Sequence, residues 1–216
     1  MTTLREVYDK IAPTRYNLYH HTRFAPELEA MAARWKEGRL LNLGCGHGPD
    51  FLPFKANFDL YGLDFSLEML KLANKYADKS EFQMTPLQAD VSRLPFRDES
   101  FNWAISIAAY HHINSKEDRL MAFTELRRVL KPGGQAFITV WNSWQGRFLF
   151  KGKEQMVPWT VKEEKLERYY YLFSYPEIQR LAKQAGFRVL RTYPESFYHY
   201  PVKYFSRNIC LWLKKD

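Results

Sequence analysis

Three glycines at alternate positions follow an apolar run near the start of the chain. Residues 40–43 form the run, and the glycines are Gly44, Gly46 and Gly48. The run predicts a buried strand, and the glycines let the backbone turn sharply and approach a ligand because they carry no Cβ. A second apolar run, residues 60–64, ends in Asp64. A glycine turn after one strand and an acid at the end of the next are typical of folds that hold the ribose of a cofactor.

The spacing of the glycines indicates the class of cofactor. The pattern is G-x-G-x-G, whereas dinucleotide-binding loops have G-x-G-x-x-G. Asp50 puts a negative charge at the loop exit, where a pyrophosphate would need a helix N-terminus. With the acid that follows, the loop resembles the S-adenosylmethionine-binding loop of class I methyltransferases, and the alternative is a bare glycine turn in another α/β protein. The resemblance implies cofactor contacts from Tyr8, Gly44, Cys45, Gly46, Gly48, Asp64, Phe65, Ser66, Asp90, Val91 and Ile107.

Composition limits the class of protein. The chain has 216 residues, 46% of them hydrophobic, which fits one α/β domain with a sizeable core. No apolar run approaches the roughly 18 residues of a membrane span, and two cysteines give no disulfide framework or metal cluster. We therefore expect a soluble, cytoplasmic protein. The net charge of +8 is compatible with binding to polyanions, chiefly nucleic acid, but on charge alone a solvated, mildly basic surface is the more ordinary explanation.

Strand and helix patterns alternate along most of the chain, which predicts a mostly parallel, Rossmann-like sheet with helices on both faces. The class I resemblance implies seven strands. We expect one domain over 1–216, with an N-terminal helical cap at 1–38 and an insertion at 142–173 that covers the active site. The predicted strands are 40–43, 60–64, 86–90, 101–109 and 135–141, the predicted helices are 115–131 and those beginning at Ser66 and Ser174, and 187–193 forms an antiparallel C-terminal hairpin with 208–213.

Five further motifs resemble a narrower family, the tRNA wobble-uridine carboxymethyl methyltransferases. They are V-Y-D-K-I-A-P at 7–13, A-I-S-I-A-A-Y-H-H at 104–112, G-G-Q-A at 133–136, V-P-W at 157–159 and R-Y-Y-Y-L-F at 168–173. The last two are the more specific, and both lie in the insertion. That family esterifies 5-carboxymethyluridine in the anticodon of tRNA, so the resemblance implies S-adenosylmethionine as cofactor and tRNA as substrate.

The chemistry of that reaction suggests which side chains take part. A carboxylate is ionised at neutral pH, so it needs no general base, only alignment with the methyl group and exclusion of water. Cationic and hydrogen-bonding groups would hold the carboxylate, and aromatic rings would stack on the uracil. His112 is the first candidate, and the others are His111, Arg168, Tyr169 and Trp159. The alternative for the two histidines is that they only satisfy backbone groups of a loop.

The N-terminal region departs from the family pattern. The family has an F-S-x-T-R-Y element soon after I-A-P, whereas here Arg15 follows at once and Arg23 better matches the expected position. Either arginine is a candidate for the substrate site. Eukaryotic members of the family also need a small zinc-binding activator subunit, and an exposed strand at 83–89 is where we expect such a partner.

Two rival functions remain open at this point. A small-molecule methyltransferase of the quinone or natural-product type, acting on oxygen or carbon, would share the glycine loop and the N-terminal motif. A catalytically silent fold would have a damaged cofactor loop, and this loop is intact. The fourth strand is followed neither by an N/D-P-P-Y/F tetrad nor by a cysteine, which favours transfer to oxygen or another already reactive acceptor.

Overall fold

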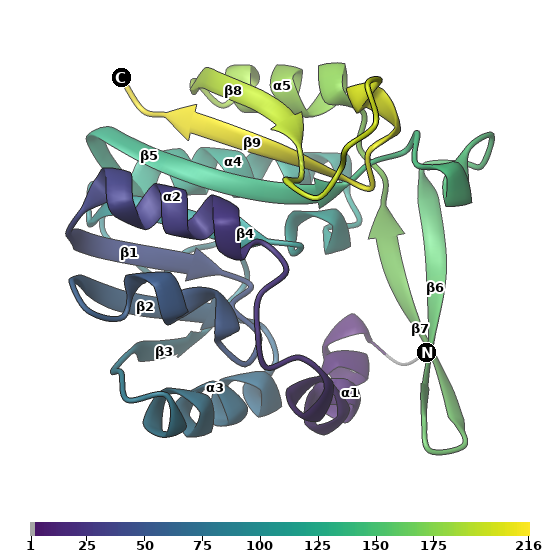
Figure 1. The fold of residues 1–216 in the computed structure, drawn as a ribbon, viewed down its shortest axis with the longest axis horizontal. Coiled ribbons are helices and arrows are strands. Elements are labelled where there is room, and N and C mark those ends of the chain that lie inside the picture. The colour runs from purple at the N-terminus through teal and green to yellow at the C-terminus, as the bar shows by residue number, and fades with distance from the viewer. Residues whose placement is uncertain (1–2) are drawn as a thin grey trace.

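A seven-stranded sheet forms the centre of the molecule. The computed structural model describes residues 3–216, and the strand order is β3-β2-β1-β4-β5-β9-β8 (Figure 1). The strands are β1 (Gly38–Leu43), β2 (Phe58–Asp64), β3 (Thr85–Gln88), β4 (Phe101–Ile107), β5 (Leu130–Trp141), β8 (Arg188–Pro194) and β9 (Asn208–Lys214). The first five pair in parallel, and β9 is antiparallel to β5 and β8. The predicted sheet and its antiparallel C-terminal hairpin are confirmed.

Helices cover both faces of this sheet, as predicted. They are α1 (Leu4–Leu18), α2 (Ala25–Trp35), α3 (Leu67–Lys79), α4 (Lys116–Val129) and α5 (Tyr175–Gln184). Apolar residues of α4 and α5 pack with Leu41 and Leu43 on one face, and those of α2 and α3 pack with Leu40 on the other. None of the helices in the described part of the chain is long and apolar enough to cross a membrane.

The expected helix starts are built by side-chain caps. The Ser66 hydroxyl accepts a hydrogen bond from the Met69 amide, and Ser174 with Glu177 forms a capping box. At α4, the Ser115 hydroxyl accepts a hydrogen bond from the Asp118 amide, but the Ser115 amide does not donate to the Asp118 side chain within the described residues. These caps start each helix directly after a loop at the carboxyl edge of the sheet, which fixes where the loop side chains lie.

Several strand boundaries differ from the prediction, most clearly those of β3, β4 and β5. The helix expected at 115–131 ends at Val129, and β5 begins at Leu130, because this buried side chain pairs with Phe101 across an irregularity in the register. The strand expected at 101–109 ends at Ile107, since Ala108 takes a left-handed conformation with φ +57°. The strand expected at 86–90 is Thr85–Gln88, so Asp90 belongs to the following loop.

The segment 142–173 contains a hairpin that its sequence did not reveal. Strands β6 (Glu154–Val161) and β7 (Glu164–Tyr171) form a separate two-stranded sheet. Figure 1 shows the hairpin extending from the sheet past α1. Leu166 of the hairpin packs with Val7 and Ile11 of α1 and with Met69 of α3. The hairpin, α1 and α3 therefore share one small apolar cluster.

Candidate functional site

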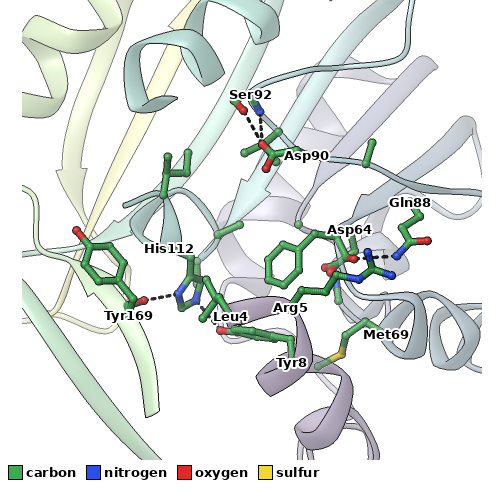
Figure 2. A pocket seen from close by; sticks show the side chains of 18 of the residues that line it. Leu4, Arg5, Tyr8, Asp64, Met69, Gln88, Asp90, Ser92, His112 and Tyr169 are labelled. Carbon is green, nitrogen blue, oxygen red and sulfur yellow. Dashed lines mark hydrogen bonds between the residues drawn. The ribbon is translucent and has the colours of Figure 1, made fainter. Parts of the chain in front are cut away.

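A cavity of about 690 Å³ lies at the carboxyl ends of the parallel strands (Figure 2). The glycine loop after β1, Asp64 at the end of β2 and Ile107 at the end of β4 all line it. In the sheet order, β1 lies between β2 and β4, so the chain reverses direction across the sheet at this point. Open α/β sheets bind ligands at such a reversal. The cavity is therefore the candidate functional site.

Asp64 joins the glycine loop to the start of α3. One carboxylate oxygen accepts a hydrogen bond from the Gly46 amide at 2.9 Å, and the other accepts from the Ser66 amide at 2.9 Å. Burial raises the pKa of Asp64 to about 6. Each carboxylate oxygen can accept a second hydrogen bond, so the group retains acceptors for a ligand in the cavity.

The glycine loop has the shape of a cradle for a ligand. Gly44 and Gly46 line the cavity in left-handed conformations, with φ +72° and +54°. A Cβ at Gly44 would lie 2.3 Å from the Cβ of Ala109, whereas a Cβ at Gly46 would meet no protein atom within 4 Å. The open side of Gly46 is space that a bound molecule can fill. The loop and the acid therefore fit a ribose-bearing cofactor such as S-adenosylmethionine.

Three predicted cofactor residues lie behind this cradle and do not line the cavity. Cys45 is buried against Gly62, and Gly48 precedes the short helix η1 (Pro49–Phe54) in a left-handed conformation. Ser66 is buried, and its hydroxyl donates to the carboxylate of Asp9 on α1 at 2.6 Å. These residues shape the loop and join it to the N-terminal helix.

The remaining predicted cofactor residues line the cavity. They are Tyr8, Phe65, Asp90, Val91 and Ile107. One oxygen of Asp90 accepts from both the amide and the hydroxyl of Ser92 at 2.7 Å, which fixes the carboxylate at the cavity wall (Figure 2). This contact fixes the Asp90 carboxylate, in the loop after β3, at the wall of the cavity.

His112 lines the cavity as a neutral side chain. Its Nδ1 lies 2.8 Å from the carbonyl oxygen of Tyr169, which can only accept, so Nδ1 carries the proton. Its Nε2 then accepts from the hydroxyl of Tyr8 at 2.6 Å (Figure 2). Burial lowers the pKa of His112 to about 3. Both ring nitrogens are therefore engaged, and His112 orients Tyr8 without supplying positive charge.

His111 does not line the cavity. Its ring is buried and stacks on Tyr170 at a centroid distance of 4.8 Å, and its Nδ1 accepts from the Trp141 amide at 3.3 Å. Burial lowers its pKa well below the usual range. This histidine supports the buried ring of Tyr170, whose centroid lies 4.4 Å from that of the cavity-lining His112.

Two guanidinium groups carry the positive charge at this end of the cavity. Arg15 lines it, and Arg168 lies behind the wall with 5% of its surface exposed. Their guanidinium carbons lie 6.0 and 4.6 Å from the Trp159 ring centroid. Among residues 3–216 neither forms a salt bridge, and both Nε of Arg168 and Nε1 of Trp159 are buried donors without an acceptor. Buried charges are normally paired, so this arrangement is suited to an anion.

The structure separates the two N-terminal arginines. Arg15 reaches the cavity from α1, whereas Arg23 is exposed and lies near Arg207. The charge of Arg23 lowers the pKa of Arg207, after the larger effect of burial.

The sequence reasoning missed Arg5, Gln88, Asn114 and Asp118, which also line the cavity. Arg5 precedes Tyr8 by three residues, and this helical spacing was a signal that it shares the face of α1 on which Tyr8 lies.

The raised pKa of Asp64 predicts how cofactor affinity depends on pH. If the carboxylate form accepts hydrogen bonds from ribose, protonation competes with binding as the pH falls through about 6. We expect the affinity for S-adenosylhomocysteine to be constant from pH 8 to 7 and to fall about tenfold per pH unit below the pKa. Calorimetric titration across this range measures it. An affinity that stays flat to pH 5 would contradict a ligand role for the Asp64 carboxylate.

Comparison with known proteins connects this geometry to a family. A family model described as "Methyltransferase domain" matches residues 41–138. The chain is 32% identical over 163 residues to a putative methyltransferase of Encephalitozoon cuniculi, and the match covers 72% of each protein. It is 37% identical over 145 residues to the tRNA (carboxymethyluridine(34)-5-O)-methyltransferase of Arabidopsis thaliana, covering 66% of this chain and 33% of the relative.

Other relatives are longer than this chain. The probable tRNA methyltransferase 9B of Homo sapiens is 31% identical over 158 residues, which are 73% of this chain and 33% of that protein. The chain thus spans about a third of the length of the 9B relatives it matches.

Solved structures share the fold. An S-adenosylmethionine-dependent methyltransferase from Clostridium acetobutylicum superposes with a TM-score of 0.77 at 14% identity, covering 97% of this chain and 99% of that one. A putative methyltransferase from Haloferax volcanii, solved with the Trm112 methyltransferase activator, superposes with a TM-score of 0.67 at 19% identity and covers 96% of each chain. With the glycine cradle and Asp64 in place, the chain belongs to the class I S-adenosylmethionine-dependent methyltransferases.

Proposed function

We propose that this protein transfers the methyl group of S-adenosylmethionine to the carboxylate oxygen of 5-carboxymethyluridine at the wobble position of tRNA. The observation that carries the proposal is the positive charge of Arg15 in the cavity and of Arg168 behind its wall, neither of which forms a salt bridge within the described part of the chain. An acceptor with a carboxylate supplies the missing negative charge. The named activity of the Arabidopsis relative and of a relative from Schizosaccharomyces pombe, 27% identical over 217 residues, supports the same acceptor.

On the cofactor side, the glycine loop and two acids divide the work. Gly44 and Gly46 leave room for the methionine part and the ribose, and Asp64 accepts hydrogen bonds from the ribose hydroxyls. Asp90 and Ile107 also line the cavity, where Asp90 would accept a hydrogen bond from the adenine amino group and Ile107 would contact the sulfonium end. When bound, S-adenosylmethionine supplies a methyl group on a positively charged sulfur, ready for attack by an oxygen.

On the acceptor side, the residues orient a group that is already reactive. Arg15, which lines the cavity, holds the carboxylate, and the buried charge of Arg168 beside Trp159 attracts it from behind the cavity wall. Neutral His112 fixes the hydroxyl of Tyr8 at the cavity wall. No residue needs to remove a proton, because the carboxylate is ionised at neutral pH. Alignment and exclusion of water then supply the rate enhancement.

We further propose an activator subunit that adds to the free edge of the sheet. Strand β3 pairs with β2, its other edge carries no partner among the described residues, and its side chains are mostly exposed. An open edge is a template for a further strand. The Haloferax methyltransferase of similar fold was solved with the activator Trm112, which supports a partner of this kind.

Methyl transfer to defined RNAs tests the proposal. We expect label from methyl-labelled S-adenosylmethionine to enter tRNA that carries 5-carboxymethyluridine and not the same tRNA with unmodified uridine. The reaction is run with and without a Trm112-type activator. Absence of label from the RNA in both conditions would sink the proposal, and label in a quinol or another small phenol instead would support the small-molecule alternative.

A further inference from the structure

Two surface segments without acidic residues lie side by side near the cavity. Segments 142–153 and 196–207 contain no Asp or Glu. The Asn142 side-chain amide donates to the carbonyl oxygens of Tyr204 at 2.6 Å and Ser206 at 2.8 Å, which joins the two segments. Figure 1 shows them as the loops that follow β5 and β8. We call the exposed rings on them, Trp144, Phe150, Tyr204 and Phe205, the aromatic surface.

These rings are exposed although they are large and apolar. The exposed fractions are 50% for Trp144 and 99% for Phe150. Trp144 lies 5.9 Å from the ring of Tyr204 and 6.4 Å from that of Phe205, so three of the rings form one group. A cluster of exposed rings on a folded protein marks a surface that another molecule covers.

Cations are interleaved with the rings. Lys203 lies 5.5 Å from the ring centroid of Tyr204, and Arg147 and Lys151 flank Phe148 beside Phe150. Burial lowers the pKa of Arg207, the charge of Arg23 lowers it further, Glu195 raises it, and Arg147 lowers it. The neighbouring carboxylate, Glu195, is 2% exposed and accepts from the backbone amides of Arg207 and Asn208. It therefore presents no acidic group at the surface.

A chain of packed side chains joins the aromatic surface to the wall of the candidate site. The guanidinium of Arg207 lies 5.4 Å from the Trp141 ring, and Trp141 lies 4.3 Å from Tyr170. Tyr170 in turn contacts His112, which lines the cavity. Only Trp141 and Tyr170 therefore separate Arg207 from the cavity-lining His112, which puts a polymer bound on the surface near the cavity.

We propose that the aromatic surface binds a single-stranded RNA loop, with bases stacked on the rings and phosphates held by the interleaved cations. The chemistry favours this occupant because stacking accepts any base, while phosphates pair with the cations. The inference rests on the proposed function, in which the acceptor is a loop nucleotide of tRNA, and it adds where the flanking nucleotides lie. An acidic protein segment would satisfy the cations but would leave the rings without a specific role.

Binding of an unmodified anticodon stem-loop tests this surface without any chemistry. We expect the double variant Trp144→Ala and Phe150→Ala to weaken binding at least about 30-fold, the effect of losing two base-stacking rings. We expect Arg147→Ala to reduce the slope of log affinity against log salt by about 0.7. Met121→Ala and Lys79→Ala, at exposed positions on α4 and α3, serve as controls and should change neither value.

Two comparisons separate failure of the surface from failure of the proposed acceptor. The kcat/KM for free 5-carboxymethyluridine should be unchanged in the Trp144→Ala and Phe150→Ala variant, while that for the modified stem-loop falls. If no carboxymethyluridine is methylated but stem-loop binding still depends on the rings, the surface stands and the acceptor is wrong. Unchanged stem-loop affinity in the ring variant, equal binding of a loopless duplex, or equal competition by polyglutamate would overturn the RNA loop proposal.

Discussion

Replacing Arg168 with methionine should lower kcat/KM for a carboxylate acceptor at least about 30-fold while leaving the protein as stable as before or more stable. Removing one partner of a buried pair of charges costs about 2–5 kcal/mol of binding free energy, which corresponds to a roughly 30- to 5,000-fold loss of affinity. Stability should not fall, because the native side chain is 5% exposed with Nε unpaired, and removing it removes a desolvation cost. Methionine retains a chain of similar length against Trp159 and Tyr170.

Thermal unfolding and steady-state kinetics measure the two halves of this prediction. Affinity for S-adenosylhomocysteine should stay unchanged, which separates a loss of acceptor binding from a damaged cofactor site. Arg191→Met is the matched control, since Arg191 is an exposed arginine over the Tyr193 ring on β8, away from the cavity. A variant at Arg168 that unfolds at lower temperature but keeps its kcat/KM would show that this arginine serves only the fold.

Replacing Asp64 with asparagine should weaken S-adenosylhomocysteine binding about 100-fold or more. The two oxygens of Asp64 accept from the amides of Gly46 and Ser66. Asparagine has one oxygen, so its NH₂ group must face one of these N–H donors, and the loop loses one hydrogen bond. The substitution also removes the charge that strengthens bonds to ribose hydroxyls, each worth about 1.5–3 kcal/mol.

Asp59→Asn is the control for this second substitution. Asp59 is an exposed residue of the same strand, at the end far from the cavity, and its replacement should leave affinity unchanged. Calorimetric titration at pH 7.5 measures both variants. An Asp64→Asn protein that binds as tightly as the parent would show that the cofactor is held without this carboxylate.

Much of the sheet could be predicted because its determinants are local. The apolar runs at Leu40 and Leu60 and the caps at Ser66 and Ser174 each depend on a few neighbouring residues. The hairpin of β6 and β7 was missed because Met156 is exposed and Arg168 is buried, which breaks the alternation of apolar and polar residues expected of a half-buried strand. The start of β5 was missed because Pro132 and the two glycines after it imitate a turn.

The candidate site was predictable on the cofactor side and less so on the acceptor side. Gly44, Gly46 and Asp64 follow strands directly, so strand order alone brings them together. The Arg15 guanidinium lies over the ring of Tyr19 and over that of Trp159, which is far along the chain. No local sequence pattern connects Arg15 with Trp159. The role of His112 was also out of reach, because its tautomer and low pKa depend on burial and on the Tyr169 carbonyl.

The central claim is that the acceptor is a carboxylate. The most direct test compares a charged acceptor nucleoside with a neutral nucleoside of the same shape. Anticodon stem-loops carrying 5-carboxymethyluridine or 5-carbamoylmethyluridine are incubated with S-adenosylmethionine, and their nucleosides are analysed by mass spectrometry. Because Arg15 and Arg168 form no salt bridge among the described residues and favour a negatively charged acceptor, we predict that only the carboxymethyl nucleoside gains the mass of a methylene group. The product is a methyl ester, which mild alkali hydrolyses. Equal methylation of both nucleosides, or a methyl group that resists alkali, would contradict the account.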